Sequence, residues 1–214
     1  MKRLKRVFLA VILIAVILIG AFAYLISPVK SFQAENIQVE SGKELLASKL
    51  IDAVKSKISN KNLTIDTDIS EQELNGLLAS EAKGKDIHAV IDKDQIIIYI
   101  NDKILQLPTQ YIIYCSLLQS DGDIYLKINK FYMGRLQIPE KMIVNKMKSK
   151  FPELNFTNDN SIKITSGIPK ALSISDIQVD NNIKFKIQIS VNSKLELLEL
   201  LIYLYPKNYN NFIK

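Results

Sequence analysis

Few side chains in this sequence are of the types that act in catalysis. The chain has one histidine, His88, and one cysteine, Cys115, and it has no Gly-x-Ser-x-Gly sequence, no phosphate-binding glycine loop and no cysteine pair for a metal. His88 lies beside a predicted turn, which favours a structural or exposed role. Cys115 lies in the middle of a predicted strand, where a small buried apolar side chain is expected. We therefore expect a protein that is not an enzyme and that uses no cofactor.

Four aspartates, Asp92, Asp94, Asp121 and Asp123, are paired in two predicted turns. Aspartates at alternate positions occur in calcium-binding loops, but neither pair is followed by the further spaced ligands and the bidentate glutamate of such a loop. Aspartate is also common in turns, because its side chain bonds to nearby backbone groups. We predict turns here and no metal site. A membrane-tethered hydrolase with paired carboxylates is a further function class, for which the sequence has no motif.

Two predicted strands are apolar on both faces. An antiparallel strand with one face in water alternates between apolar and polar side chains, as Ile183–Val191 does, whereas Gln95–Asn101 and Thr109–Gln119 do not. One explanation is that helices cover both faces of the sheet. The other is a sheet curved around an apolar groove that binds acyl chains. The sequence leaves open which face would line the groove; the candidate ligand-binding residues are Leu74, Leu77, Leu78, Ile96, Ile98, Ile100, Tyr111, Ile113 and Leu117.

These residues are positioned by predicted helices and strands. Capping boxes, in which a serine and a glutamate three residues later bond to each other's backbone N–H, predict a helix over 41–60 and another from Ser70 to Gly84. The sequence Ser120-Asp-Gly-Asp123 predicts a hairpin. Strands are predicted at 63–68, 88–92, 95–101, 109–119, 124–132, 161–165, 173–179 and 183–191. Further helices are predicted at 193–205 and at 139–151, the latter with Ile143, Met147 and Phe151 on its buried face. The fold class is α+β with a long antiparallel sheet.

A run of 20 residues near the N-terminus, Val7–Ile26, has no charged side chain. As a helix it would be about 30 Å long, which matches the hydrocarbon core of a bilayer. Four basic residues lie within the six positions before it, and basic flanks stay in the cytoplasm. We expect a single-pass protein of the cell membrane, with its N-terminus in the cytoplasm and its C-terminal domain outside.

On this reading the chain has three parts: residues 1–26 are the basic flank and transmembrane anchor, 27–40 a short tether and lead-in, and 41–214 the extracytoplasmic α+β domain. An alternative is a cleaved signal peptide, because Ala21-Phe22-Ala23 has the small-x-small form of a cleavage site. The apolar run continues past this site to Ile26, which favours an uncleaved anchor. Cleavage after Ala23 stays open at this point.

The charge of the predicted domain argues against nucleic-acid binding. Of the 28 Lys and Arg residues, four lie in the N-terminal flank, and the remaining 24 face 22 Asp and Glu residues. The domain is therefore nearly neutral, without the basic surplus that nucleic acid requires. A single cysteine forms no internal disulfide, so the fold must be stabilised by burial of apolar side chains.

Four stretches of the predicted domain carry a resemblance to known proteins: Ile69-Ser-Glu-Gln-Glu-Leu-Asn-Gly-Leu-Leu78, Ile91-Asp-Lys-Asp-Gln-Ile-Ile-Ile98, Asp121-Gly-Asp-Ile-Tyr-Leu-Lys127 and Gly134-Arg-Leu-Gln-Ile-Pro139. Together with the anchor, this series resembles the YpmS-like membrane proteins of Firmicutes, which are Gram-positive. More distantly it is similar to bacterial tubular lipid-binding (TULIP) proteins, which wrap a long curved sheet around a helix and hold lipid tails between them. The resemblance implies a TULIP-like fold and transfers no catalytic residue.

Two functions follow from these observations. In the first, the domain binds membrane lipid or another long apolar ligand between sheet and helix, without catalysis, and Lys127, Lys130 and Arg135 lie near a headgroup phosphate. In the second, the domain is a ligand-free envelope scaffold that binds protein partners of unknown identity. In that case the aromatic side chains near the C-terminus form a docking edge: Tyr203, Tyr205, Tyr209 and Phe212.

Overall fold

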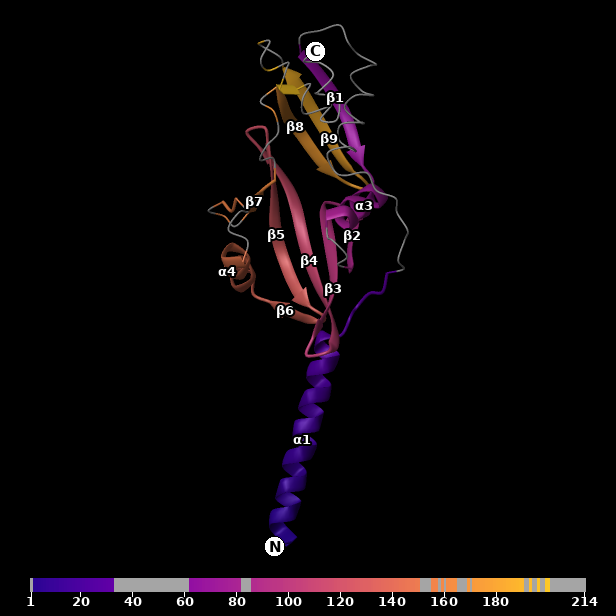
Figure 1. Ribbon diagram of the computed structural model, residues 1–214, viewed down its shortest axis with the longest axis vertical. Coiled ribbons are helices and arrows are strands. Elements are labelled where there is room, and N and C mark those ends of the chain that lie inside the picture. The colour runs from indigo at the N-terminus through magenta and orange to yellow at the C-terminus, as the bar shows by residue number, and fades with distance from the viewer. Residues whose placement is uncertain are drawn as a thin grey trace, which may run out of the picture.

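The N-terminal helix α1 (Lys2–Ile26) extends from one end of an elongated domain and continues the direction of its long axis (Figure 1). Among the residues that the structure describes, no helix is long and apolar enough to be identified as a membrane span. The structure is a computed structural model, and it describes residues 2–32, 62–81, 86–150, 155–157, 159, 161–164, 169, 171–190, 193, 196, 199 and 200.

The larger sheet contains a meander of five antiparallel strands in the order β2-β3-β4-β5-β6. Their bounds are β2 Asp86–Asp92, β3 Gln95–Ile104, β4 Leu107–Ser120, β5 Asp123–Met133 and β6 Leu136–Ile138. The short strand β7 (Ser161–Lys163) also pairs with β5. The predicted hairpin between β4 and β5 is confirmed: Asp121 and Gly122 both have positive φ, at 54° and 81°, as a tight turn between twisted strands requires.

The smaller sheet has three strands in the order β1-β9-β8. Their bounds are β1 Asn62–Ile69, β8 Leu172–Val179 and β9 Ile183–Ser190. The predicted alternation in β9 is confirmed, because Ile183, Ile187 and Ile189 are buried while Lys184 and Lys186 are exposed. The antiparallel α+β class is confirmed as well, but the structure divides the strands between two sheets, whereas the sequence predicted one long sheet.

The two sheets meet at the tip of the β4–β5 hairpin. The backbone N–H of Ile174 in β8 donates to the carbonyl of Gly122, at 3.3 Å, and the side chain of Gln119 donates to the carbonyl of Ile174, at 3.1 Å. Ile124 of β5 packs into the same buried cluster as Leu172 and Ile174 of β8. The smaller sheet therefore stands at the end of the domain that is remote from α1 (Figure 1).

Two further helices pack on the larger sheet: α3 (Glu71–Glu81) and α4 (Glu140–Lys150). The capping box of α3 is confirmed, because Glu73 accepts from the Ser70 N–H at 2.8 Å and the Ser70 hydroxyl accepts from the Glu73 N–H at 3.2 Å. On α4 the fully buried side chain is Val144, with 1% of its surface exposed, while Ile143 and Met147 are half-buried.

Several predictions concern residues outside the described ranges. They are the helix over 41–60, the end of α3 at Gly84, Phe151 of α4, and the aromatic residues near the C-terminus. Of the helix predicted over 193–205, residues 196, 199 and 200 are described as helical, and Leu200 is buried.

Candidate functional site

Apolar side chains of four strands form three rows across one face of the larger sheet. Directly paired residues of an antiparallel ladder project on the same side, so the strand register identifies each row. Beginning at the end remote from α1, the rows are Ile91–Ile96–Cys115–Ile128, Ala89–Ile98–Ile113–Phe131 and Ile87–Ile100–Tyr111–Met133. We call these twelve residues the apolar face. It contains five of the six strand residues predicted as ligand-binding, and the sixth, Leu117, lies two residues further along β4 on the same side.

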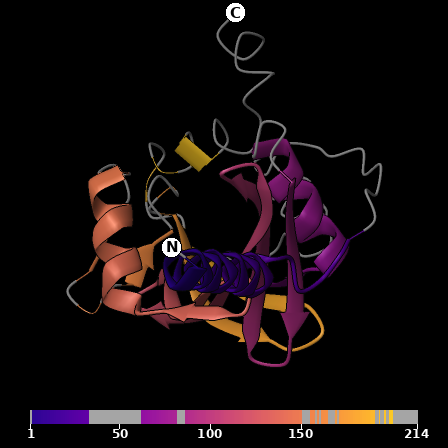
Figure 2. The same cartoon turned by 90° about the horizontal axis from the view of Figure 1, so that it is seen from below.

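Helices α3 and α4 flank this face on opposite sides (Figure 2). Leu74 and Leu78 of α3 pack with Ile91 and Ile96 at the β2 side. Met147 of α4 packs with Cys115 and its neighbours at the β5 side. Two of the three leucines predicted as ligand-binding thus join the apolar face, while the third, Leu77, is half-buried on α3.

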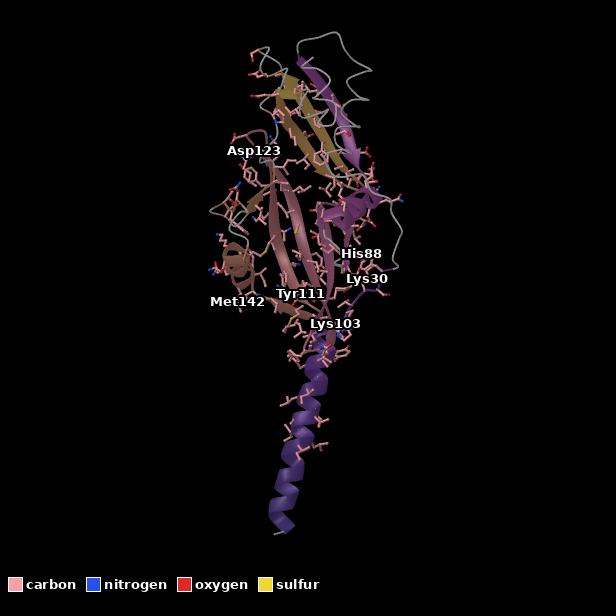
Figure 3. The ribbon with its side chains drawn as sticks, in the orientation of Figure 1. Lys30, His88, Lys103, Tyr111, Asp123 and Met142 are labelled. Carbon is pink, nitrogen blue, oxygen red and sulfur yellow. The ribbon has the colours of Figure 1, made fainter. Side chains whose placement is uncertain are left out.

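Burial of the apolar face decreases towards α1. All four side chains of the row furthest from α1 are buried, and Cys115 has only 1% of its surface exposed. In the row nearest α1, none of the four side chains is buried; all are half-buried. We call this row the open row: Ile87, Ile100, Tyr111 and Met133. Tyr111 lies in the half of the domain next to α1 (Figure 3). The face is therefore closed at its far end and keeps apolar surface accessible at the end that α1 joins.

Two members of the open row, Ile87 and Met133, were not among the ligand-binding residues predicted from the sequence. Ile87 comes one residue before the predicted strand, and Met133 comes one residue after its strand. The sequence pattern does indicate that both residues lie on this face. Ile87 continues the alternation of Ala89 and Ile91, and Met133 continues that of Phe131. Strand ends are the least certain part of such predictions, and Ile87 and Met133 lie at the ends of β2 and β5.

The chain segment that follows α1 packs on part of the opposite face of the sheet. Phe32 packs against Tyr99 and the buried side chains around it. The Phe32 ring also stacks on His88, with ring centroids 4.6 Å apart, and the His88 Nε2 lies 2.9 Å from a carboxylate oxygen of Asp86. Burial raises the pKa of Tyr99, with smaller contributions from Tyr114 and Asp92. Of the two roles predicted for His88, structural or exposed, these contacts fit the structural one.

The segment after α1 is bound to the sheet through Gln110, whose side chain is fully buried. Its Oε1 accepts from the backbone N–H groups of Val29 and Lys30, both at 3.1 Å. Its Nε2 donates to the carbonyl of Lys30 at 2.7 Å and to the side chain of Asn101 at 2.8 Å. Residues 28–32, predicted as part of a short tether, are therefore held against the start of β4.

The end of α1 is in direct contact with the turn between β5 and β6. Gly134, with φ at 58°, lies so close to the helix end that an added Cβ would be 2.5 Å from the carbonyl carbon of Ile26. The N–H of Arg135 donates to the carbonyl of Leu25 at 2.7 Å. The Arg135 guanidinium donates to the Tyr24 carbonyl at 3.0 Å and lies over the Tyr24 ring. A cation at this helix end is favourable, because the last carbonyls carry partial negative charge. We call these contacts, with Gln110, the helix junction.

Two polar side chains of α3 bond to the edge strand β2. The side-chain amide of Asn75 accepts from the Ala89 N–H at 2.6 Å and donates to the Ala89 carbonyl at 2.8 Å. Glu71 accepts from the Ile91 N–H at 2.9 Å. The helix thus satisfies backbone groups of an outer strand that would otherwise be open to pairing with another chain.

Replacing Asn75 by alanine is expected to lower the free energy of unfolding by about 2 kcal/mol, because both backbone groups of Ala89 lose their partner. Urea unfolding of the two proteins measures this. Gln72→Ala is the matched control, since Gln72 is exposed on the same helix and should change stability by less than about 0.5 kcal/mol. Equal effects of the two substitutions would contradict the assigned role of Asn75.

Cys115 is buried in the apolar face, as predicted for a small apolar side chain. Burial raises the pKa of its thiol to about 12. We expect the native protein to react with a thiolate-specific reagent at pH 8 about a thousandfold more slowly than the urea-unfolded protein, because the thiolate is the reacting form. The folded state holds this proton while the unfolded state releases it near pH 9, so unfolding should become easier above about pH 9. Stoichiometric labelling of the native protein as fast as that of the unfolded protein would contradict this.

The two aspartates of the β4–β5 turn have a structural partner or turn geometry. Asp123 forms an ion pair with Lys163 of β7, which ties that short strand to the start of β5. Asp121 has a positive φ, which aspartate tolerates better than most residues. Within the described ranges, no three residues of metal-ligating type are grouped closely enough to hold an ion.

Comparison of the chain with protein-family models, with curated proteins and with solved structures finds no match.

Proposed function

We propose that α1 anchors the protein in the cell membrane as a single span, with the N-terminus in the cytoplasm and the sheet domain outside. Two observations support this. The apolar run Val7–Ile26 ends where the helix junction begins. The described side chains of α1 are not packed on the domain before this junction: Leu13, Val16 and Ile19 have 58%, 60% and 65% of their surface exposed. An apolar helix with this much free surface needs lipid or protein around it.

We further propose that the domain binds acyl chains of membrane lipid along the apolar face, without catalysis and without a cofactor. The observation that carries this proposal is the open row. Its four side chains are apolar or aromatic, they lie side by side across four strands, and they remain half-buried at the end of the sheet that α1 joins. A lipid tail that leaves the bilayer beside α1 would meet this row first. The arrangement of a sheet with α3 and α4 on its flanks is compatible with the TULIP-like wrapping that the sequence resemblance implies.

Transfer of a tail from the bilayer to this face requires no energy source. Each methylene group gains about 0.8 kcal/mol on leaving water, whether it enters a bilayer or an apolar protein surface. The exchange between the two is therefore close to neutral, and binding is reversible. The tail that covers the open row also removes its apolar side chains from water.

The proposal is tested with the full chain in phospholipid vesicles that contain a phospholipid with a photoactivatable group in its tail. After illumination, lipid adducts are mapped by mass spectrometry of peptides. We expect adducts in α1 and also on peptides that carry Ile100, Tyr111 and Met133. Adducts confined to α1 would support the anchor and contradict lipid binding by the domain. In that case a single protein cross-linked in stoichiometric amount to the domain would favour the scaffold function.

A further inference from the structure

The hairpin between β3 and β4 has an unusual turn. Its two central residues, Leu105 and Gln106, both have positive φ, at 50° and 71°. This conformation costs a residue with a Cβ about 1 kcal/mol or more, and such turns usually contain asparagine, aspartate or glycine. The corresponding turn between β4 and β5 contains Asp121 and Gly122. The β3–β4 turn therefore holds a leucine where a polar or small residue would be less strained.

The strained leucine is also the most exposed large apolar side chain that the structure describes. Leu105 has 86% of its surface exposed, compared with 39% for Leu25 at the end of α1. Neither packing nor backbone preference in the domain explains a leucine at this place. An apolar side chain of this kind is accounted for if it lies in an apolar environment outside the protein.

The position of the turn indicates what that environment is. Gln110 of β4 is level with residues 29 and 30, just after α1. Strand β4 runs away from α1 to the β4–β5 turn, after which Asp123 begins β5 and pairs with the last residue of β4 (Figure 3). Leu105, five residues before Gln110, therefore lies on the side of the helix junction that faces the membrane anchor, up to about 15 Å further along the strand direction. Figure 1 shows the β3–β4 hairpin beside the end of α1.

A cleft with basic residues lies between the hairpin and the segment that follows α1. Lys103, two residues before Leu105, and Lys30 line a cleft of about 680 Å³ at the base of the hairpin. Both lysines are exposed. Lys103 lies near the level where α1 meets the domain, whereas Lys30 lies further from α1, beside His88, with its Nζ over the rings of Phe32 and Tyr99 (Figure 3). Asp86 and Asp102 also line this cleft, so it offers partners for both the phosphate and the ammonium group of a phospholipid headgroup.

We propose that the β3–β4 hairpin is a second membrane contact, in which Leu105 inserts at the acyl-chain boundary beside α1 while Lys103 lies at the level of the lipid phosphates. The inference rests on the proposed anchoring by α1. An interfacial contact of one leucine and one lysine is weak alone but effective next to a span, because the anchor already holds the tip at the membrane surface. Together with the helix junction, this contact holds the domain with its long axis along the membrane normal.

The absence of tryptophan from the chain makes a direct test possible. Three variants of the full chain each carry one tryptophan: Leu105→Trp at the hairpin tip, Leu118→Trp at the opposite end of β4, and Leu18→Trp within α1. Each is reconstituted in vesicles of phosphatidylcholine and phosphatidylglycerol, with bromine atoms placed either near the headgroup end or near the middle of the acyl chains. Leu118 is the matched control, because it is an exposed leucine that lies next to the hairpin tip remote from the membrane.

We expect Leu105→Trp to emit at shorter wavelength than Leu118→Trp and to lose about half of its emission or more with bromine near the headgroup end, as an interfacial side chain does. Leu118→Trp should be unaffected by either lipid. If Leu18→Trp is quenched and Leu105→Trp is not, the hairpin contact is refuted while the anchor stands. If Leu18→Trp is not quenched, the anchor is refuted, and the inference with it.

Discussion

Replacing Gly134 by alanine is expected to separate the end of α1 from the sheet and to destabilise the domain by about 3 kcal/mol or more. The alanine Cβ would lie 2.5 Å from the carbonyl carbon of Ile26 and closer still to the carbonyl oxygen of Leu25, and both are backbone atoms that cannot move alone. A residue with a Cβ is also strained at the φ of 58° found here. The hydrogen bond from Arg135 to Leu25 would be lost when the helix end shifts.

Limited proteolysis measures this effect at the helix junction itself. In the native protein the N–H and the carbonyl of Lys30 are both bonded to Gln110, so trypsin cannot readily draw this segment into its active site. We expect Gly134→Ala to raise the rate of cleavage after Lys30 about tenfold or more.

Gly122→Ala is the matched control for this substitution. Gly122 also has a positive φ, but its added Cβ would meet only the Ser173 Cβ, at an ordinary distance of 3.5 Å. It should therefore destabilise the protein through backbone strain, without faster cleavage after Lys30. Cleavage that rises equally in both variants would show that Gly134 has no special role at the junction.

Replacing Met133 by glutamate is expected to lower photolabelling of the apolar face by tail-modified phospholipid about a hundredfold, a change of about 3 kcal/mol in binding free energy. Met133 is half-buried in the open row, between Tyr111 and the short strand β6. A lipid tail in contact with a glutamate would have to remove a carboxylate from water without a partner, or protonate it. The half-buried position lets the glutamate reach solvent in the absence of lipid, so the fold should be retained.

The control is Leu118→Glu, which introduces the same charge at an exposed leucine on the other face of the sheet. It should leave labelling of the apolar face unchanged. Labelling of α1 in the same samples reports the amount of protein in the membrane and should be equal in all three proteins. Unchanged labelling of the apolar face in Met133→Glu would refute binding at the open row.

Locally determined elements of this fold were predictable from the sequence. The Ser70–Glu73 capping box and the Asp121-Gly122 turn each depend on residues within four positions, so their chemistry is visible in a short stretch of sequence. Contacts between distant segments were not predictable. Nothing near Leu63 indicates that β1 pairs with β9, and nothing near Gly134 indicates that this glycine lies against the end of α1.

The candidate site was predictable only where it depends on a local sequence pattern. Alternation along β3 and β4 placed Ile98 and Ile113 among the candidates, because residues two apart share a face whatever their partner strand is. The contribution of β2 and β5 to that face depends on register, which turns and bulges set. One such irregularity lies between Tyr114 and Cys115, opposite Lys130 and Ile128. The buried roles of Gln110 and Asn75 depend on which distant backbone groups face them.

The pairing of β1 with β9 has a consequence for the order of folding. Asp68 and Asn182, 114 positions apart, are joined by a hydrogen bond at one end of this pair, whereas the strands from β2 to β5 are joined by turns of two residues. Contacts of low sequence separation form fast, and contacts of high separation form late. On the proposed topology the N-terminus stays in the cytoplasm and the chain after α1 emerges in sequence order, so the β2–β5 meander can form while the C-terminal part is still being translocated. On that topology the sheet remote from α1 would close only after residues 183–190 have emerged, and β1 would spend the interval as an unpaired strand that is open to wrong partners.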